Sequence, residues 1–99
     1  MALLLDERSV IQAAEVLLSN GPLAVECQIT VEWLRGVEEP TWYGYLLPHD
    51  PNVYVLPGRY WVRLGEEPFV VLVRRPVRLA DALCFPYWGL GSPPPIGGA

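Results

Sequence analysis

Leu56-Pro57-Gly58-Arg59-Tyr60-Trp61-Val62-Arg63-Leu64-Gly65-Glu66-Glu67-Pro68-Phe69-Val70-Val71-Leu72-Val73 is the stretch that decides the fold. It predicts a β-hairpin whose turn is Gly65-Glu66-Glu67-Pro68. The first arm alternates, so one face would hold Tyr60, Val62 and Leu64 and the other Arg59, Trp61 and Arg63. The second arm, residues 69–73, is apolar on both faces, which is typical of a strand covered on both sides or of a packed barrel wall.

The length and the composition of the chain limit the possible architectures. The chain has 99 residues, 52% of them hydrophobic and 18% charged, which is enough for one core and too apolar for a disordered chain. We therefore expect residues 1–90 to form a single compact domain and the Gly- and Pro-rich residues 91–99 to form a flexible tail. Four Trp and five Tyr are many for this length, so some of them should line a groove or an interface.

The net charge of −4 is unevenly distributed. Residues 1–50 carry two Arg against eight acidic residues, a net charge of −6, whereas residues 51–99 carry five Arg against three, a net charge of +2. A negative net charge argues against general nucleic-acid binding, because such binding needs several cationic contacts to phosphate. The simplest explanation is pairing of acidic and basic strands within one fold, for example of Arg59 and Arg63 with Glu26 and Glu32.

The N-terminal region carries a helical pattern. Asp6 can cap a helix and Glu7 would add a favourable charge in its first turn. An apolar stripe then recurs at helical spacing over Val10, Ala13, Ala14, Leu17 and Leu18. Asn20-Gly21-Pro22 is a strong helix stop. The pattern predicts one N-terminal helix over about residues 7–19, packed on the sheet.

Three further segments read as strands. Residues 23–33 alternate in polarity over their whole length, which predicts a half-exposed antiparallel strand. Residues 41–47 form an aromatic-rich second strand, in which Gly44 marks a bulge or a close approach by another segment. Residues 83–88 form the last strand, and Pro86 within it requires an edge position or a bulge.

Together these elements predict a mainly β (α+β) fold. It would be a small bent antiparallel sheet, or a partly open barrel, of about five strands with one N-terminal helix. The succession of Trp42-x-Gly44, Pro57-Gly58-x-Tyr60-x-Val62-x-Leu64 and a returning apolar strand resembles small SH3-like barrels over residues 41–90. That resemblance implies an architecture and no particular activity, because such folds host many functions.

One strand face is the main candidate for binding. Arg59, Trp61 and Arg63 would place cations beside an aromatic ring, a combination that can stack a base or hold an acidic peptide. Trp42, Tyr43 and Tyr45 could extend this face. The run Arg74-Arg75-Pro76-Val77-Arg78 adds three arginines that could hold a phosphate or an acidic partner. The alternatives are internal ion pairs for the first set and a solvated strand end for the second.

The sequence contains only weak patterns for catalytic residues and for metal ligands. His49 lies beside Asp50 in a Pro-bounded loop, but adjacency in sequence does not orient a base toward a nucleophile. A metal site needs three or four ligands, and no spacing in the chain matches one. We therefore expect no enzyme, no catalytic residues, no metal and no cofactor. Cys27 and Cys84 are expected to be buried free thiols, with a disulfide left open if their strands are neighbours.

These observations predict a small non-catalytic β-barrel-like module that acts through a protein partner or by self-association as a homo-oligomer. Single-stranded nucleic-acid binding through the Arg/Trp face is the alternative. The chain shows no signal peptide and no apolar run long enough to span a bilayer, so we expect a cytoplasmic protein without membrane contact. The absence of lysine and the scarcity of amides fit either a thermophile or a GC-rich genome.

Overall fold

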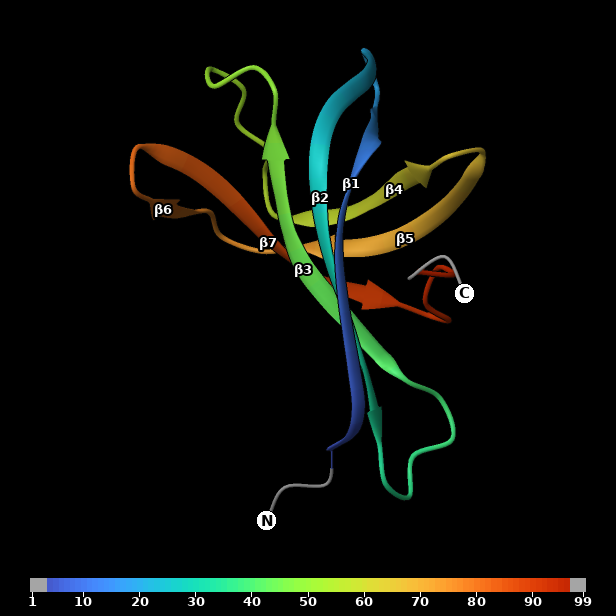
Figure 1. The fold of residues 1–99 in the computed structure, drawn as a ribbon. Coiled ribbons are helices and arrows are strands. Elements are labelled where there is room, and N and C mark those ends of the chain that lie inside the picture. Colours follow the sequence, from blue (N-terminus) through green and yellow to red (C-terminus); the bar gives the residue numbers. More distant parts are fainter. Residues whose placement is uncertain (1–3, 97–99) are drawn as a thin grey trace.

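A computed structural model describes residues 4–96, which form a mainly β fold of seven strands (Figure 1). The strands are β1 (Leu4–Leu18), β2 (Gly21–Leu34), β3 (Thr41–Pro48), β4 (Gly58–Leu64), β5 (Glu67–Val73), β6 (Val77–Leu79) and β7 (Ala82–Leu90). Their order is β3-β2-β1-β4-β5-β7-β6, and β3 also pairs with β7. This last pairing closes six antiparallel strands into a barrel, with β6 as an extra strand on β7. The predicted small β-barrel is thus confirmed, and it is closed.

The predicted N-terminal helix is wrong: residues 4–18 form β1. This strand pairs with β2 in an antiparallel hairpin that runs from Leu18 opposite Gly21 to Leu4 opposite Leu34. Ala13 and Leu17 completed the helical stripe, yet Val10, Ala14 and Val16 also alternate and face inward. The Asn20-Gly21 pair is a hairpin-turn signal as much as a helix stop. The alternating strand β2 needs a neighbour, so tertiary pairing overrides the local pattern.

The opening stretch forms the predicted hairpin, β4–β5. Leu64 lies opposite Glu67, so the loop is the two residues Gly65 and Glu66, and the predicted turn residues Glu67 and Pro68 already belong to β5. Gly65 has φ of 66°. A positive φ at the first loop position is what a type II′ turn requires, and this turn matches the twist of the two strands.

Two residues with special backbone roles lie on β3 and β7. A Cβ added at Gly44 would lie 1.7 Å from the carbonyl oxygen of Gln28, so the predicted close approach is confirmed. Pro86 lies where the neighbour of β7 changes from β6 to β5, and its carbonyl accepts a hydrogen bond from the Arg74 amide at 2.8 Å. The missing N–H of Pro86 therefore falls in the gap between the two pairings.

The barrel interior holds one apolar core. Its members come from six strands and include Val16, Val25, Ile29, Val31, Leu46, Val62, Leu64, Val71, Val73, Phe85 and Tyr87. The predicted inward face of β4 therefore does pack with Ile29 and Val31. Part of the segment expected to be a tail also packs: Pro94 is buried, and Ile96 lies against the core. Residues 97–99 lie outside the described part of the chain.

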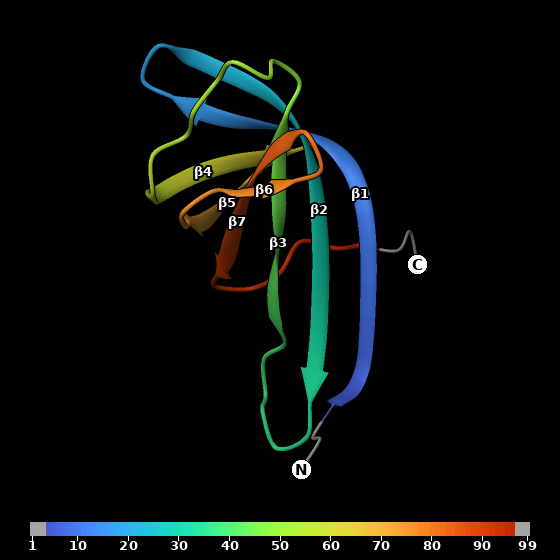
Figure 2. The same ribbon diagram turned by 90° about the vertical axis from the view of Figure 1, so that its left-hand side faces the viewer.

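The long β1–β2 hairpin and the loop between β2 and β3 extend past the rest of the barrel (Figure 2). Only Glu15, Val16 and Leu17 of β1 pair with β4, so the preceding part of the strand runs along one side of the molecule. The body of the barrel carries the candidate site on its outer surface, where β4, β5, β7 and β3 lie side by side.

Candidate functional site

The site is built from one row of side chains across four strands. Arg59 on β4 lies opposite Leu72 on β5, Leu72 lies opposite Trp88 on β7, and Trp88 lies opposite Tyr43 on β3. Residues directly opposite each other in antiparallel strands share a face. Arg59, Leu72 and Trp88 are exposed and Tyr43 is half-buried, so this face is the outer one. We call these four residues the aromatic row.

Trp88 is the centre of the row. Its ring lies 5.7 Å from that of Tyr43 in a tilted arrangement, and the Arg74 guanidinium lies over its indole at 5.6 Å from the ring centroid. Even so, 46% of Trp88 is exposed to solvent. Exposed indole beside a cation is a combination that binds flat or acidic ligands.

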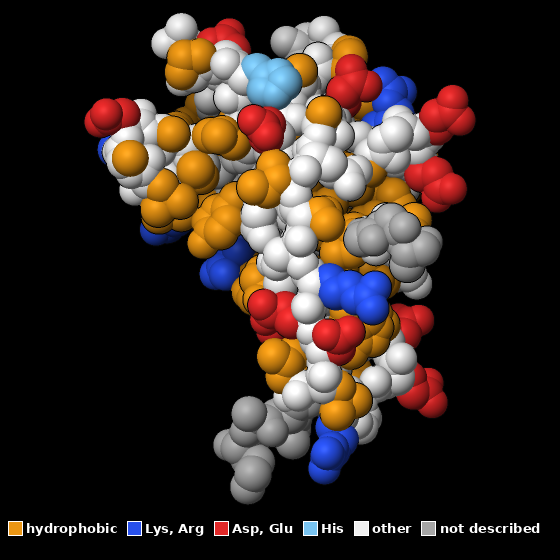
Figure 3. Space-filling model, viewed as in Figure 1, with side chains coloured by type: hydrophobic (Ala, Val, Ile, Leu, Met, Phe, Trp, Pro, Cys, Tyr) orange, Lys and Arg blue, Asp and Glu red, His pale blue; other side chains and the backbone are white. Residues whose placement is uncertain are grey.

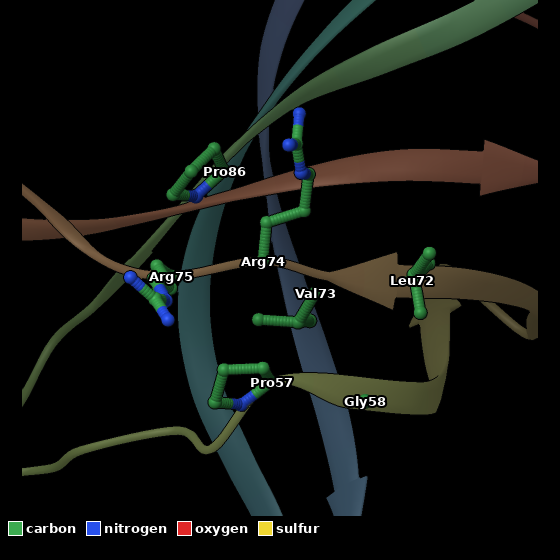
Figure 4. A pocket seen from close by; sticks show the side chains of 7 residues that line it. All are labelled: Pro57, Gly58, Leu72, Val73, Arg74, Arg75 and Pro86. Carbon is green, nitrogen blue, oxygen red and sulfur yellow. The ribbon is translucent and has the colours of Figure 1, made fainter.

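A groove adjoins the row at Leu72 (Figure 4). It has a volume of about 430 Å³ and is lined by Pro57, Gly58, Leu72, Val73, Arg74, Arg75 and Pro86. Figure 4 shows Arg74 extending toward β7 and Arg75 pointing away from it. The lining thus combines an apolar floor with two guanidinium groups. We call it the arginine groove.

The arginines at this site form no ion pair with a carboxylate of residues 4–96. In residues 4–96, the ion pairs join Arg8 to Asp6 and Arg63 to Glu15. Arg59, Arg74 and Arg75 are exposed and lie outside both pairs. Guanidinium groups recognise carboxylates and phosphates by paired N–H donors, so these three side chains are available to an anionic ligand.

The opposite end of the row is acidic. Partial burial raises the pKa of Tyr43 above its ordinary value, and the nearby charges of Glu32 and Glu7 raise it further. Glu32 and Glu7 face each other on β2 and β1. The outer surface therefore runs from basic at β4–β5 to acidic at β1–β2.

Trp42 does not belong to the predicted binding face. It is 2% exposed, and its ring makes edge contacts with Phe69 and Tyr87 in the core. A Cβ added at Gly89 would fall 2.0 Å from the Trp42 indole, so the glycine makes room for the ring. Alternation places Trp42 and Tyr43 on opposite faces, which is why only Tyr43 of this pair reaches the surface.

The predicted ion pairs with Glu26 and Glu32 are wrong. Arg63 instead donates hydrogen bonds from Nε and Nη2 to Glu15, at 3.1 Å from Nε. The reason is topological, since β1 lies between β4 and β2 in the sheet. Arg59 lies opposite Leu72 and remains free of an ion pair in the described residues.

The other predicted site residues are dispersed. Trp61 is exposed on β4 opposite Val70, two residue pairs along from Arg59. Arg78 is exposed on β6 and does not line the arginine groove. Tyr45 is exposed on β3 and lines a separate apolar groove with Ile11.

Trp88, Leu72 and Pro86 are site residues that sequence reasoning missed. The alternation of residues 83–88 did place Trp88 on the face opposite Phe85 and Tyr87. The pairing of β7 with both β5 and β3 was needed to bring Trp88 beside Leu72 and Tyr43, and no local pattern specifies that register.

Figure 3 shows hydrophobic side chains gathered over the β6–β7 region, bordered by arginines.

His49 lies in the loop after β3, in a pocket of about 270 Å³ that Asp50 and Asp81 also line. Its backbone N–H bonds to the Ala24 carbonyl, and Asp50 accepts a hydrogen bond from the Asn52 amide. In the described residues, no hydrogen bond or ion pair joins the imidazole to a carboxylate. No cluster of three or more His, Cys, Asp or Glu suited to a metal ion occurs between residues 4 and 96.

The thiols are both buried and free, as predicted. Burial raises the pKa of Cys27 from 9.0 to about 11, and a hydrogen bond with Tyr87 lowers it in part. Burial also raises the pKa of Tyr87, whose hydroxyl donates to the Gln28 carbonyl at 3.1 Å. These groups tie β2 to β7 across the core and lie away from the surface site.

Comparison with protein-family models, with curated proteins and with solved structures found no match for this chain. The described part of the chain contains no helix with the length and apolar character needed to cross a membrane.

Proposed function

We propose that the chain is a small non-catalytic binding module whose partner is a protein segment rich in acidic and apolar side chains. The arginine groove and the aromatic row would hold this segment together. The observation that carries the proposal is the lining of the groove, where Arg74 and Arg75 lie beside Leu72 and Val73 and pair with no carboxylate of the described residues 4–96.

This surface exposes apolar side chains to water, and a bound segment would cover them. Trp88 and Leu72 expose apolar area on the rim of the groove, and aromatic and arginine side chains are those enriched at interface centres. The guanidinium groups would select carboxylates and orient the bound segment. Apolar contacts would then supply affinity and arginine contacts would supply specificity.

The test is a titration with the peptide Glu-Glu-Leu-Phe-Glu-Glu, followed by the intrinsic tryptophan fluorescence of the protein. Because Trp88 lies under Arg74, its emission should change on binding. The double variant Arg74→Gln/Arg75→Gln removes two exposed charge contacts, each worth about 0.5–1 kcal/mol, so affinity should fall about five- to thirty-fold. Arg35→Gln is the matched control, since Arg35 is an exposed arginine outside the groove.

Two results would contradict the proposal. One is an unchanged emission at millimolar peptide, and the other is equal binding by wild type and the double variant. The same peptide with Gln in place of Glu should bind more weakly, because only the carboxylates can pair with Arg74 and Arg75.

A second candidate is single-stranded nucleic acid, favoured by the stacked geometry of Arg74 over Trp88 beside Tyr43. Base stacking on exposed aromatic rings with arginines alongside is how many single-strand binders work. This alternative expects fluorescence quenching by an oligonucleotide at low salt and a steep loss of affinity as salt rises. An unchanged emission with oligonucleotide would remove it.

A further inference from the structure

One edge of β1 has no strand beside it. On one side β1 pairs with β2 along its length, whereas on the other side it meets β4 only at Glu15, Val16 and Leu17. Residues 4–14 therefore present a row of backbone N–H and C=O groups that no strand in the described part of the chain covers. Figure 2 shows β1 as the outermost strand on its side of the molecule.

The middle of this edge, residues 9–14, lacks the usual protection, whereas Asp6, Glu7 and Arg8 place charges at its outer end. Natural edge strands are commonly short, bulged, or interrupted by proline or lysine. Residues 4–14 contain neither residue, and the register irregularity lies at the far end, between Leu4 and Asp6. From Ser9 to Ala14 the edge is also uncharged. Its side chain at Ile11 is 67% exposed.

We propose that two copies of this chain pair through these β1 edges, in antiparallel orientation about a two-fold axis at Ile11. A two-fold axis perpendicular to a sheet brings an edge against its own copy, so one segment serves both sides of the contact. Each edge would satisfy the backbone groups of the other, as in any antiparallel ladder.

The charges along the edge suit this register. With the axis at Ile11, Val10 lies opposite Gln12 of the second copy, and Ser9 lies opposite Ala13. Arg8 falls opposite the uncharged Ala14. The ladder ends at this point, because Glu15 of each copy already pairs with Arg63 of its own β4. No uncompensated pair of like charges is therefore brought together, which is the condition for self-pairing.

The surface next to the edge is apolar. Ile11 lines a groove of about 260 Å³ with Tyr45, Leu47 and Leu79. All four side chains are exposed. They come from three strands, β1, β3 and β6. In the dimer, Ile11 of the second copy would lie beside this groove and continue its apolar lining. The pairing would thus cover an exposed strand edge and the adjoining apolar surface with the same segment.

Light scattering coupled to size-exclusion chromatography tests the pairing on the full chain. The wild type should move from a mass of one chain to a mass of two chains as its concentration rises from micromolar to millimolar. Ile11→Lys should keep the mass of one chain, with an unchanged circular dichroism spectrum. Leu56→Lys is the matched control, since Leu56 is 66% exposed and lies away from β1, and it should dimerise as the wild type does.

A cross-link tests the register separately. Residues opposite each other in antiparallel strands have Cα atoms about 4.5–5.5 Å apart, within the span of a disulfide. Ile11→Cys should therefore form a covalent dimer on mild oxidation, whereas Leu56→Cys, with the same native thiols, should not.

A wild type that stays monomeric at millimolar concentration would overturn the pairing, as would an Ile11→Lys variant that dimerises normally. The contact uses no residue of the arginine groove. A monomeric wild type that still binds the acidic peptide therefore contradicts the pairing alone and leaves the proposed function standing.

Discussion

Arg63 on β4 and Glu15 on β1 face each other across the short pairing of these two barrel strands. The guanidinium donates from Nε, at 3.1 Å, and from Nη2 to one carboxylate oxygen of Glu15. Within residues 4–96, β1 and β4 pair over only three residue positions. The ion pair therefore lies on the shortest contact among the barrel strands and contributes to its register.

A double-mutant cycle of Arg63→Gln and Glu15→Gln should show a coupling of about 0.2–1 kcal/mol, because both side chains are partly exposed and the pair is screened. Urea unfolding measures it, and 1 M salt should reduce it. The control cycle of Arg63→Gln with Glu26→Gln should show none. Equal coupling in both cycles would contradict the observed pairing.

Gly89→Ala should destabilise the barrel by about 1–3 kcal/mol, because the new methyl group meets the Trp42 indole. Thermal unfolding followed by circular dichroism measures the loss. The diagnostic control is Gly89→Ala combined with Trp42→Leu, which removes the ring. The double variant should lose less stability than the sum of the two single losses. Strict additivity would show that the two residues do not compete for space.

Stability should fall as pH rises from 9 toward 11. The folded-state pKa of Cys27 is about 11, above its ordinary value of 9.0, so in this window the unfolded chain loses the thiol proton while the folded chain keeps it. Proton release then favours unfolding. Burial of Tyr87 acts in the same direction. Urea midpoints at pH 8 and 10.5 measure the effect.

Cys27→Val isolates the contribution of the thiol, because valine fills a similar volume and cannot ionise. The loss of stability between the two pH values should be smaller in this variant than in the wild type. An identical loss in both proteins would assign the pH dependence to other groups. Below pH 8 the thiol should contribute no pH dependence, since it is protonated in both states.

Local patterns predicted the hairpin β4–β5, the strand β2 and the inward faces of both, since period-two alternation directly reflects burial in a sheet. They failed at β1, where Ala13 and Leu17 on the outer face made the helical and extended patterns equally apolar. Only the long pairing with β2 decides between the two.

The candidate site could be predicted only in part. Exposure of Arg59 and Trp61 follows from alternation within β4. The neighbours of Arg59 depend on strand order, which placed β1 beside β4 and so gave Arg63 a partner other than Glu26 or Glu32. Trp88 joins the row because β7 pairs with β5 and β3 at once, a long-range register that residue patterns do not encode.

The proposed binding of an acidic protein segment by the arginine groove and the aromatic row can be followed residue by residue. Backbone amide and indole N–H chemical-shift mapping with the peptide Glu-Glu-Leu-Phe-Glu-Glu tests it most directly. Binding at this site should produce shifts that saturate with peptide and cluster at Arg59, Leu72, Arg74, Arg75 and Trp88. An absence of shifts, or shifts confined to the β1 edge or to the His49 loop, would contradict it.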